Sequence, residues 1–381
     1  MNYTQLNYHV EWEICVFDQR WQQLAKIIVH HSLELQPNDL LRIQAEAIAK
    51  PLLYALYREA LHAGALVIPK IVDPVFEEIM LKEGTPEQLQ FVPSTLVHEI
   101  ETMTTWCDIY SEINTKHFNQ ADQQRQLLRR KAFGPVQVLF DSRAAQNQLR
   151  WCDVLYPTEA FAQDAGMSLW DFEDLVVKSY LLDHPDPVTA WQTIHQQQQK
   201  VTHFLNSCRS IRIEGPDVDL SYRCEDRIWI NCAGKRNLPD GEVFTAPIED
   251  SVNGRLKISY PSIYQGNLVS GIQLVIEDGK VTQATAEQGQ DFLHTMLDLD
   301  AGARYIGEVA FGLNPGITKP TGHTIFDEKM AGTMHLALGR AYPECGGKNE
   351  STLHWDLVCD LHQAEVYANN ALCYKNGEFI I

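Results

Sequence analysis

Carboxylate and imidazole side chains gather in five short patches in the C-terminal part of this chain. The patches are residues 241–244, 307–310, 327–329, 335–339 and 351–356, and they hold three Glu, two Asp and two His. Oxygen and nitrogen ligands of this kind suit divalent Zn, Co, Mn or Mg. The residue types therefore predict a divalent-metal site with the hydrolytic chemistry that such ions support.

Two of these patches carry the strongest local signals. Glu308 stands within the largely apolar run 303–312, where a carboxylate is costly unless it is paired or bound to a cation. His354 and Asp356 are two residues apart in a segment typical of a strand, so both side chains would point to one face of a sheet. Such a pair can hold one metal ion or flank two.

The remaining candidates are weaker when each is taken alone. Glu242 follows the turn sequence 237–241 at an expected strand start, but an isolated glutamate is usually a surface residue. His335 opens a run of small residues that we expect to be helical. Tyr342 lies seven residues further on and would share the same helical face. Its hydroxyl would then reach the metal site, although packing in the core is an equally good explanation.

Strands and helices alternate in the N-terminal half of the chain, as a parallel sheet requires. The apolar spacing predicts helices over residues 21–31 and 47–63, and strands over 40–45 and 65–69. A strand–helix–strand unit of this length favours parallel pairing. Residues 136–140 are a further strand candidate. We therefore expect an α/β domain with a parallel sheet over residues 1–200.

The spacing of apolar residues changes near Ser210, from a helical pattern to short alternating runs. Helices are expected over 171–182 and 191–205, and after them short alternating runs are separated by turns. This pattern is typical of a mostly antiparallel β region. Two helices, over 286–299 and 332–340, are expected to interrupt it. The prediction is an α+β domain over residues 201–381 that carries the metal-binding and catalytic residues.

Charge and composition exclude several classes of function. The 381 residues carry a net charge of −19, which argues against nucleic acid and anionic membrane surfaces as partners. No apolar run is long enough to span a membrane, and the N-terminus lacks the features of an export signal. The nine Cys form no C-x-x-C pair. Reduced thiols and a cytoplasmic location are therefore expected.

Motif searches narrow the chemistry further. The chain contains no glycine-rich phosphate loop, no G-x-S-x-G and no H-E-x-x-H, so nucleotide binding, serine hydrolase chemistry and zincin chemistry have no support.

The patches together resemble the aminopeptidase T/aminopeptidase S family of thermophilic metallopeptidases. The matching stretches, in order along the chain, are 237–247, 307–314, Asp327–Glu328, 335–342 and 354–356.

The resemblance implies a ligand set and an assembly. It implies a two-metal centre of divalent Zn, Co, Mn or Mg and a homodimer that takes short peptides. The implied metal ligands are Glu242, Glu308, Glu328, His335, His354 and Asp356. In the family pattern the ligand-type glutamate stands five residues before the histidine, whereas Glu328 stands seven residues before His335 here. The role of Glu328 therefore stays open.

The expected activity is that of a cytoplasmic metal-dependent aminopeptidase. Water activated by two metal ions would attack the first peptide bond, with Glu242 or Glu328 as general base and Tyr342 stabilising the oxyanion. One alternative is a catalytically silent metal-binding relative that kept the fold. Another is a metallohydrolase that acts on a non-peptide amide or ester. Measuring the turnover of peptide and ester substrates would distinguish these three hypotheses.

Overall fold

The structure is a computed structural model of the chain and describes residues 18–381. These residues form two compact units. Unit 1 comprises residues 18–163, 182–188 and 235–238, and unit 2 comprises residues 164–181, 189–234 and 239–381. Because the chain passes between the units several times, the units do not coincide with a single cut at residue 200.

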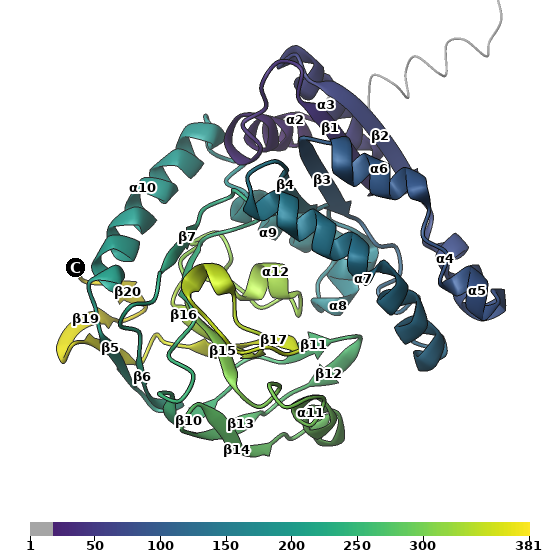
Figure 1. Cartoon of the computed structure of the whole chain (residues 1–381). Helices are drawn as coiled ribbons and strands as arrows, with labels where there is room; N and C mark the ends of the chain where they lie inside the picture. The colour runs from purple at the N-terminus through teal and green to yellow at the C-terminus, as the bar shows by residue number, and fades with distance from the viewer. Residues whose placement is uncertain (1–17) are drawn as a thin grey trace, which may run out of the picture. The chain divides into compact units, whose positions relative to one another are not determined.

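Unit 1 is built on a five-stranded sheet in the order β2-β1-β3-β4-β8, and all of its pairings are parallel (Figure 1). This confirms the parallel sheet predicted for the N-terminal half. Its elements are α2 (Gln19–Ile27), the π-helical turn η1 (Ile28–Ser32), β1 (Leu40–Glu46), the 3-10 turn η2 (Ala47–Ala49), α3 (Lys50–His62), β2 (Leu66–Val72), α4 (Pro74–Glu83), α5 (Pro86–Leu89), α6 (Ser94–Thr102), β3 (Thr105–Tyr110), α7 (Gln123–Ala145), β4 (Arg150–Leu155), α8 (Glu159–Asp164) and β8 (Asn237–Leu238).

The strand predicted over residues 136–140 is wrong, because these residues lie inside helix α7. Val136, Leu139 and Phe140 are spaced i, i+3 and i+4, so they share one helical face. That face packs into an apolar cluster with Ile100 and Trp106. A short apolar run has the same composition in a buried strand and in a buried helical face, and the neighbouring segments decide between them.

Unit 2 is mostly antiparallel, as the sequence predicts. Its elements are α9 (Leu169–Ser179), α10 (Pro187–Asn206), β5 (Ser210–Glu214), β6 (Val218–Arg223), β7 (Ile230–Cys232), β9 (Glu242–Thr245), β10 (Asn253–Lys257), β11 (Ser262–Tyr264), β12 (Asn267–Val269), β13 (Gln273–Glu277), β14 (Lys280–Thr285), α11 (Gln290–Leu297), β15 (Ile306–Gly312), α12 (Thr324–Asp327), β16 (Thr333–Gly339), the 3-10 turn η3 (Pro343–Cys345), β17 (His354–Asp360), β18 (Glu365–Ala368), β19 (Ala371–Lys375) and β20 (Glu378–Phe379).

Two larger antiparallel sheets and a two-stranded one make up the β structure of unit 2. The first has eight strands in the order β14-β13-β10-β6-β5-β18-β19-β20, and the second has five in the order β17-β16-β15-β9-β7 (Figure 1). One apolar cluster takes side chains from both, including Leu220 and Leu274 from the first and Val309, Leu336 and Trp355 from the second. The five-stranded sheet therefore has one face committed to the core.

The helix predicted over residues 332–340 is wrong. These residues form strand β16, which pairs with β15 on one side and β17 on the other. All seven residues of β16 are buried, as the interior strand of a sheet covered on both faces requires. The expectation that His335 and Tyr342 share a helical face fails with it. Among the described residues, no helix is both long and apolar enough to cross a membrane.

Candidate metal centre

One face of the five-stranded sheet carries most of the residues that the sequence singled out. Along β16, Met334 and Leu336 belong to the apolar core cluster, so His335 between them points to the opposite face. The same alternation sets the direction of the side chains on β9, β15 and β17. The residues that it places on this opposite face are Glu242, Glu308, His335, His354 and Asp356.

Strand register brings these side chains together. Glu308 on β15 and Asp356 on β17 both pair with Ala337 on β16, so the two carboxylates flank a methyl group in one row across the sheet. His335 stands opposite Ala310 on β15. Small side chains at these two positions leave room above the sheet for long ionisable ones. The run of small residues around His335 is therefore a feature of the site.

The ligand atoms form overlapping groups. Within each group of three, one nitrogen or oxygen from every residue lies within 4.8 Å of the others. Three of these groups are Glu242 with Glu308 and His335, Glu308 with His354 and Asp356, and Glu328 with His335 and Asp356. Glu308, His335 and Asp356 each belong to two groups. All six residues predicted as metal ligands thus converge in one place.

Both imidazoles are oriented by backbone carbonyls. His335 Nδ1 donates to the carbonyl oxygen of Glu328 at 3.1 Å, and His354 Nδ1 donates to that of Arg340 at 2.9 Å. Because a carbonyl can only accept, Nε2 of each neutral ring is left with its lone pair directed at the carboxylates. Histidine ligands of metals are typically held through the other ring nitrogen in this way.

Lys329 is the residue that sequence reasoning missed. Its side chain is 2% exposed, and its ammonium forms ion pairs with Glu242, with Glu328 at 2.8 Å and with Asp240 at 3.8 Å. Burial lowers the pKa of Lys329, but these three carboxylates outweigh burial and raise it well above its usual value. The available signal was a lysine directly after Asp327 and Glu328 in a candidate patch.

Glu328 and Asp327 take different roles although they are adjacent. Glu328 follows the short helix α12 and reaches the cluster. Asp327 accepts hydrogen bonds from the backbone nitrogens of Thr321 and Gly322 at 2.7 and 2.8 Å. It therefore fixes the loop before α12. The seven-residue interval from Glu328 to His335 is compatible with convergence, because the intervening residues turn into β16.

Tyr342 reaches the cluster by a route other than the predicted helix. It lies just beyond the end of β16, and its ring centroid is 5.0 Å from that of His354 and 5.5 Å from that of Phe244. Burial, together with the charges of Glu308 and Asp356, raises the pKa of its hydroxyl. The hydroxyl therefore stays protonated at neutral pH and can act as a hydrogen-bond donor.

The buried carboxylates of the cluster are stabilised by nearby positive charge. Burial raises the pKa of Glu242 to about 8 although Lys329 opposes the shift. Burial lowers the pKa of His335, but its hydrogen bond with Glu308 and the charges of Glu242 and Asp356 outweigh burial and raise it to about 10. Protons thus provide the balancing charge in the absence of another cation. A divalent ion would replace these protons at the same atoms.

Two buried oxygens show that the cluster fits metal ions. Glu242 Oε2 and Asp356 Oδ1 are both buried and have no hydrogen-bond partner among residues 18–381. Buried polar atoms are almost always satisfied, and these two face His335 Nε2 at 3.6 and 3.9 Å. Carboxylate oxygens and imidazole Nε2 atoms are the donor set that Zn, Co and Mn accept.

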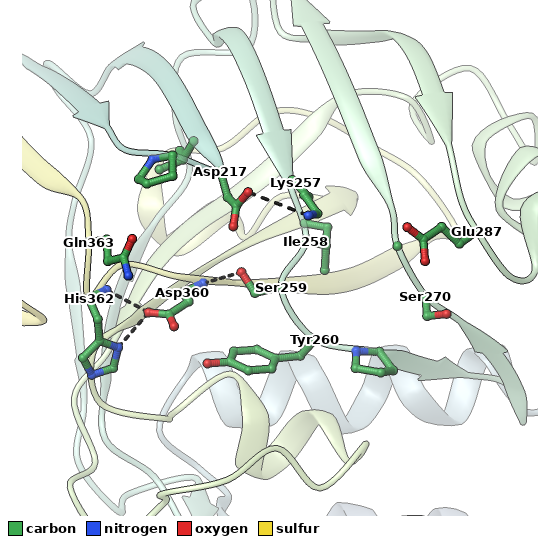
Figure 2. A pocket seen from close by; sticks show the side chains of 14 residues that line it. Asp217, Lys257, Ile258, Ser259, Tyr260, Ser270, Glu287, Asp360, His362 and Gln363 are labelled. Atoms are coloured by element: carbon green, nitrogen blue, oxygen red, sulfur yellow. Dashed lines mark hydrogen bonds and ion pairs between the residues drawn. The ribbon is translucent and has the colours of Figure 1, made fainter.

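A pocket of about 510 Å³ elsewhere in unit 2 contains none of the predicted ligands. Figure 2 shows its charged lining, in which His362 Nδ1 lies 2.7 Å from Asp360 Oδ1 and Lys257 approaches Asp217 at 3.9 Å. These pairs are half-exposed and mutually compensated. The pocket therefore lacks the convergence of unpaired buried oxygens and imidazoles found on the five-stranded sheet.

The fold and this cluster define a metal-dependent hydrolase. The chain belongs to the family of thermophilic metalloproteases (M29), whose model matches residues 17–379. It is therefore a metallopeptidase, an enzyme of the hydrolase class. This confirms the family resemblance inferred from the five patches.

Individual relatives agree with that membership. The chain is 27% identical to Aminopeptidase 2 of Geobacillus stearothermophilus, over 89% of this chain and 92% of that protein. It is 31% identical to Aminopeptidase T of Thermus aquaticus, over 57% and 58% respectively. The wild-type AmpT structure from Thermus thermophilus has the same fold, with a TM-score of 0.84 at 22% identity, and covers 96% of this chain and 100% of that one.

Proposed function

We propose that this metallopeptidase is an aminopeptidase that works with two divalent metal ions. The observation that carries the proposal is the sharing of Glu308 and Asp356 between neighbouring groups of ligand atoms. Shared carboxylates suit a pair of adjacent cations, because the negative charge of each one is then close to both ions. The relatives with aminopeptidase names support the choice of reaction.

The proposed ligands are the six residues that converge: Glu242, Glu308, Glu328, His335, His354 and Asp356. When bound, the ions would supply Lewis acidity that activates water and polarises the scissile carbonyl. Glu242 or Glu328 is the proposed general base. Lys329 contacts both carboxylates and holds them in place. Tyr342 would donate its hydroxyl proton in a hydrogen bond to the developing oxyanion.

The wider setting of the activity is also part of the proposal. We propose residues 201–381 as the catalytic domain, short peptides as substrates, and a homodimer as the working assembly. The eight described cysteines are free thiols, which agrees with the cytoplasmic location expected from the sequence. Zn, Co, Mn and Mg all remain candidates for the ions, since the donors are nitrogen and oxygen.

Metal removal tests the proposal. Dialysis against a chelator should abolish release of N-terminal residues from peptides, and Zn, Co or Mn should restore it. Elemental analysis should find two ions per chain in the active enzyme. His354→Ala should lose metal as well as turnover, whereas His98→Ala, at an exposed histidine, should change neither. Full aminopeptidase activity in a demonstrably metal-free sample would contradict the proposal.

A further inference from the structure

The side chains of the candidate metal centre differ in their exposure to solvent. The side chain of Lys329 is 2% exposed, that of Glu308 is 5% exposed and that of His354 is 18% exposed. Arg340, which follows β16, is exposed. His354 and Arg340 are therefore among the more exposed residues at the centre, and we expect a substrate to approach past them.

Arg340 is close to the centre on this open side. Its carbonyl oxygen accepts the hydrogen bond from His354 Nδ1, so its backbone is part of the support for a proposed ligand. Its Cζ atom is 5.8 Å from the centroid of the Tyr342 ring, which is 5.0 Å from the centroid of the His354 ring. These distances place the guanidinium no more than 10.8 Å from His354.

The guanidinium of Arg340 differs from the other cation at the centre. Lys329 is buried and surrounded by three carboxylates. Arg340, by contrast, is exposed and forms no ion pair with any residue in the described range 18–381. Its charge is therefore available to a ligand that binds beside the centre.

A short peptide needs such a cation. The carboxylate at its C-terminus would be repelled by the net charge of −19. Each extended residue spans about 3.3–3.6 Å, so the carboxylate of a dipeptide to a tetrapeptide falls within the reach of Arg340 when the first peptide bond is at the centre. Guanidinium binds a carboxylate through two parallel hydrogen bonds, which a point charge cannot do.

We propose that Arg340 is a specificity-determining residue that binds the C-terminal carboxylate of short peptide substrates. The inference rests on the proposed aminopeptidase function and adds a substrate class to it, namely peptides of about two to four residues with a free C-terminus. Longer peptides carry their carboxylate past Arg340 and gain nothing from it.

The test compares two tripeptides that differ only in a C-terminal carboxylate or carboxamide. Both begin with the residue that the enzyme releases fastest, followed by Gly-Gly. The measured quantity is the ratio of kcat/KM for the acid to kcat/KM for the amide. Arg340→Gln should lower this ratio about tenfold, mainly through KM, and Arg340→Lys should lower it less. The matched control is Arg255→Gln, an exposed arginine on β10, which should keep the wild-type ratio.

The outcomes separate this inference from the function on which it rests. Metal content and thermal midpoint are measured for each variant, since the side-chain change leaves the Arg340 carbonyl in place. If the metal-loaded wild type cleaves neither tripeptide, the proposed function is wrong. If wild type cleaves both, and Arg340→Gln and Arg340→Lys keep the wild-type ratio with normal metal content, Arg340 does not bind the carboxylate.

Discussion

Glu308 contacts both imidazoles of the cluster, one with each carboxylate oxygen. Oε1 lies 3.2 Å from His335 Nε2, and Oε2 lies 3.5 Å from His354 Nε2. Each oxygen of this carboxylate therefore faces the Nε2 atom of a different proposed histidine ligand. We propose that Glu308 bridges the two cations from this position. The sequence already marks Glu308 as exceptional, because a charge within a buried apolar strand needs compensation.

Replacement of Glu308 by Gln tests the bridging role. The amide keeps the shape of the side chain and removes its charge, so the folded protein should bind metal much more weakly and lose turnover on the order of 100-fold or more. Metal should also raise the thermal midpoint of the variant less than that of wild type. Glu277→Gln, at the exposed last residue of β13, is the control. Two tightly bound metals per chain in Glu308→Gln would assign the bridge to another carboxylate.

Asp153 in unit 1 gives a pH dependence that is separate from the metal centre. Burial raises the pKa of its carboxyl to about 7, against the hydrogen bond from the Tyr110 hydroxyl at 2.8 Å, and the nearby Asp108 adds to the rise. An acid with a raised folded-state pKa favours folding when protonated. Its ionisation therefore reduces stability progressively from about pH 4, and the loss is complete above about pH 7.

Asp153→Asn should remove this dependence. Relative to wild type, the variant should gain stability between pH 5 and pH 8, by about 1–3 kcal/mol. The measurement is the difference in thermal midpoint between variant and wild type at the two pH values. A difference that stays constant, or that shrinks as pH rises, would show that Asp153 ionises normally in the folded protein.

At the scale of elements, strand β15 combines a bulge with the central carboxylate. Its register against β16 shifts between Ile306 and Glu308, which leaves Gly307 as the extra residue. A Cβ atom on Gly307 would collide with the carbonyl oxygens of Gly339 and Arg340. Because the Arg340 carbonyl holds His354, this glycine links the local course of β15 to the orientation of an imidazole.

Gly307→Ala should therefore damage both the sheet and the site. The collision with backbone atoms should cost about 1–3 kcal/mol of stability, and displacement of the Arg340 carbonyl should weaken metal binding. Denaturant unfolding and elemental analysis would measure the two effects. Gln283→Ala on exposed β14 should stay within about 0.5 kcal/mol of wild type. If Gly307→Ala keeps the stability and metal content of wild type, the bulge tolerates a Cβ atom at this position.

At the scale of the whole molecule, the oligomeric state of the enzyme gives a further prediction. The family resemblance implies a homodimer, and light scattering should then give about twice the chain mass of 43.4 kDa. The metal-loaded enzyme should remain dimeric at the concentration of the assay. A monomer with full activity would show that assembly is not needed for the proposed chemistry, since all six proposed ligands lie within unit 2 of one chain.

The spacing of residues along the chain was enough to predict a metal-dependent hydrolase and much of the fold. Period-two alternation placed His354 and Asp356 on one face, and β17 confirms it. The strand–helix–strand pattern at residues 40–69 determined a parallel sheet, and the short alternating runs after Ser210 determined an antiparallel one. These features are local, because they depend on the spacing of polar and apolar side chains along a single segment.

How the segments meet depends on long-range contacts in the folded chain. Residues 333–339 are apolar and small, so they fit a helix or a strand until β15 and β17 supply hydrogen-bond partners on both sides. Lys329 became part of the site only when strand register brought Glu242, 87 residues away in the chain, to its ammonium. Pairing of this kind depends on contacts between distant segments, which the spacing within one segment does not encode.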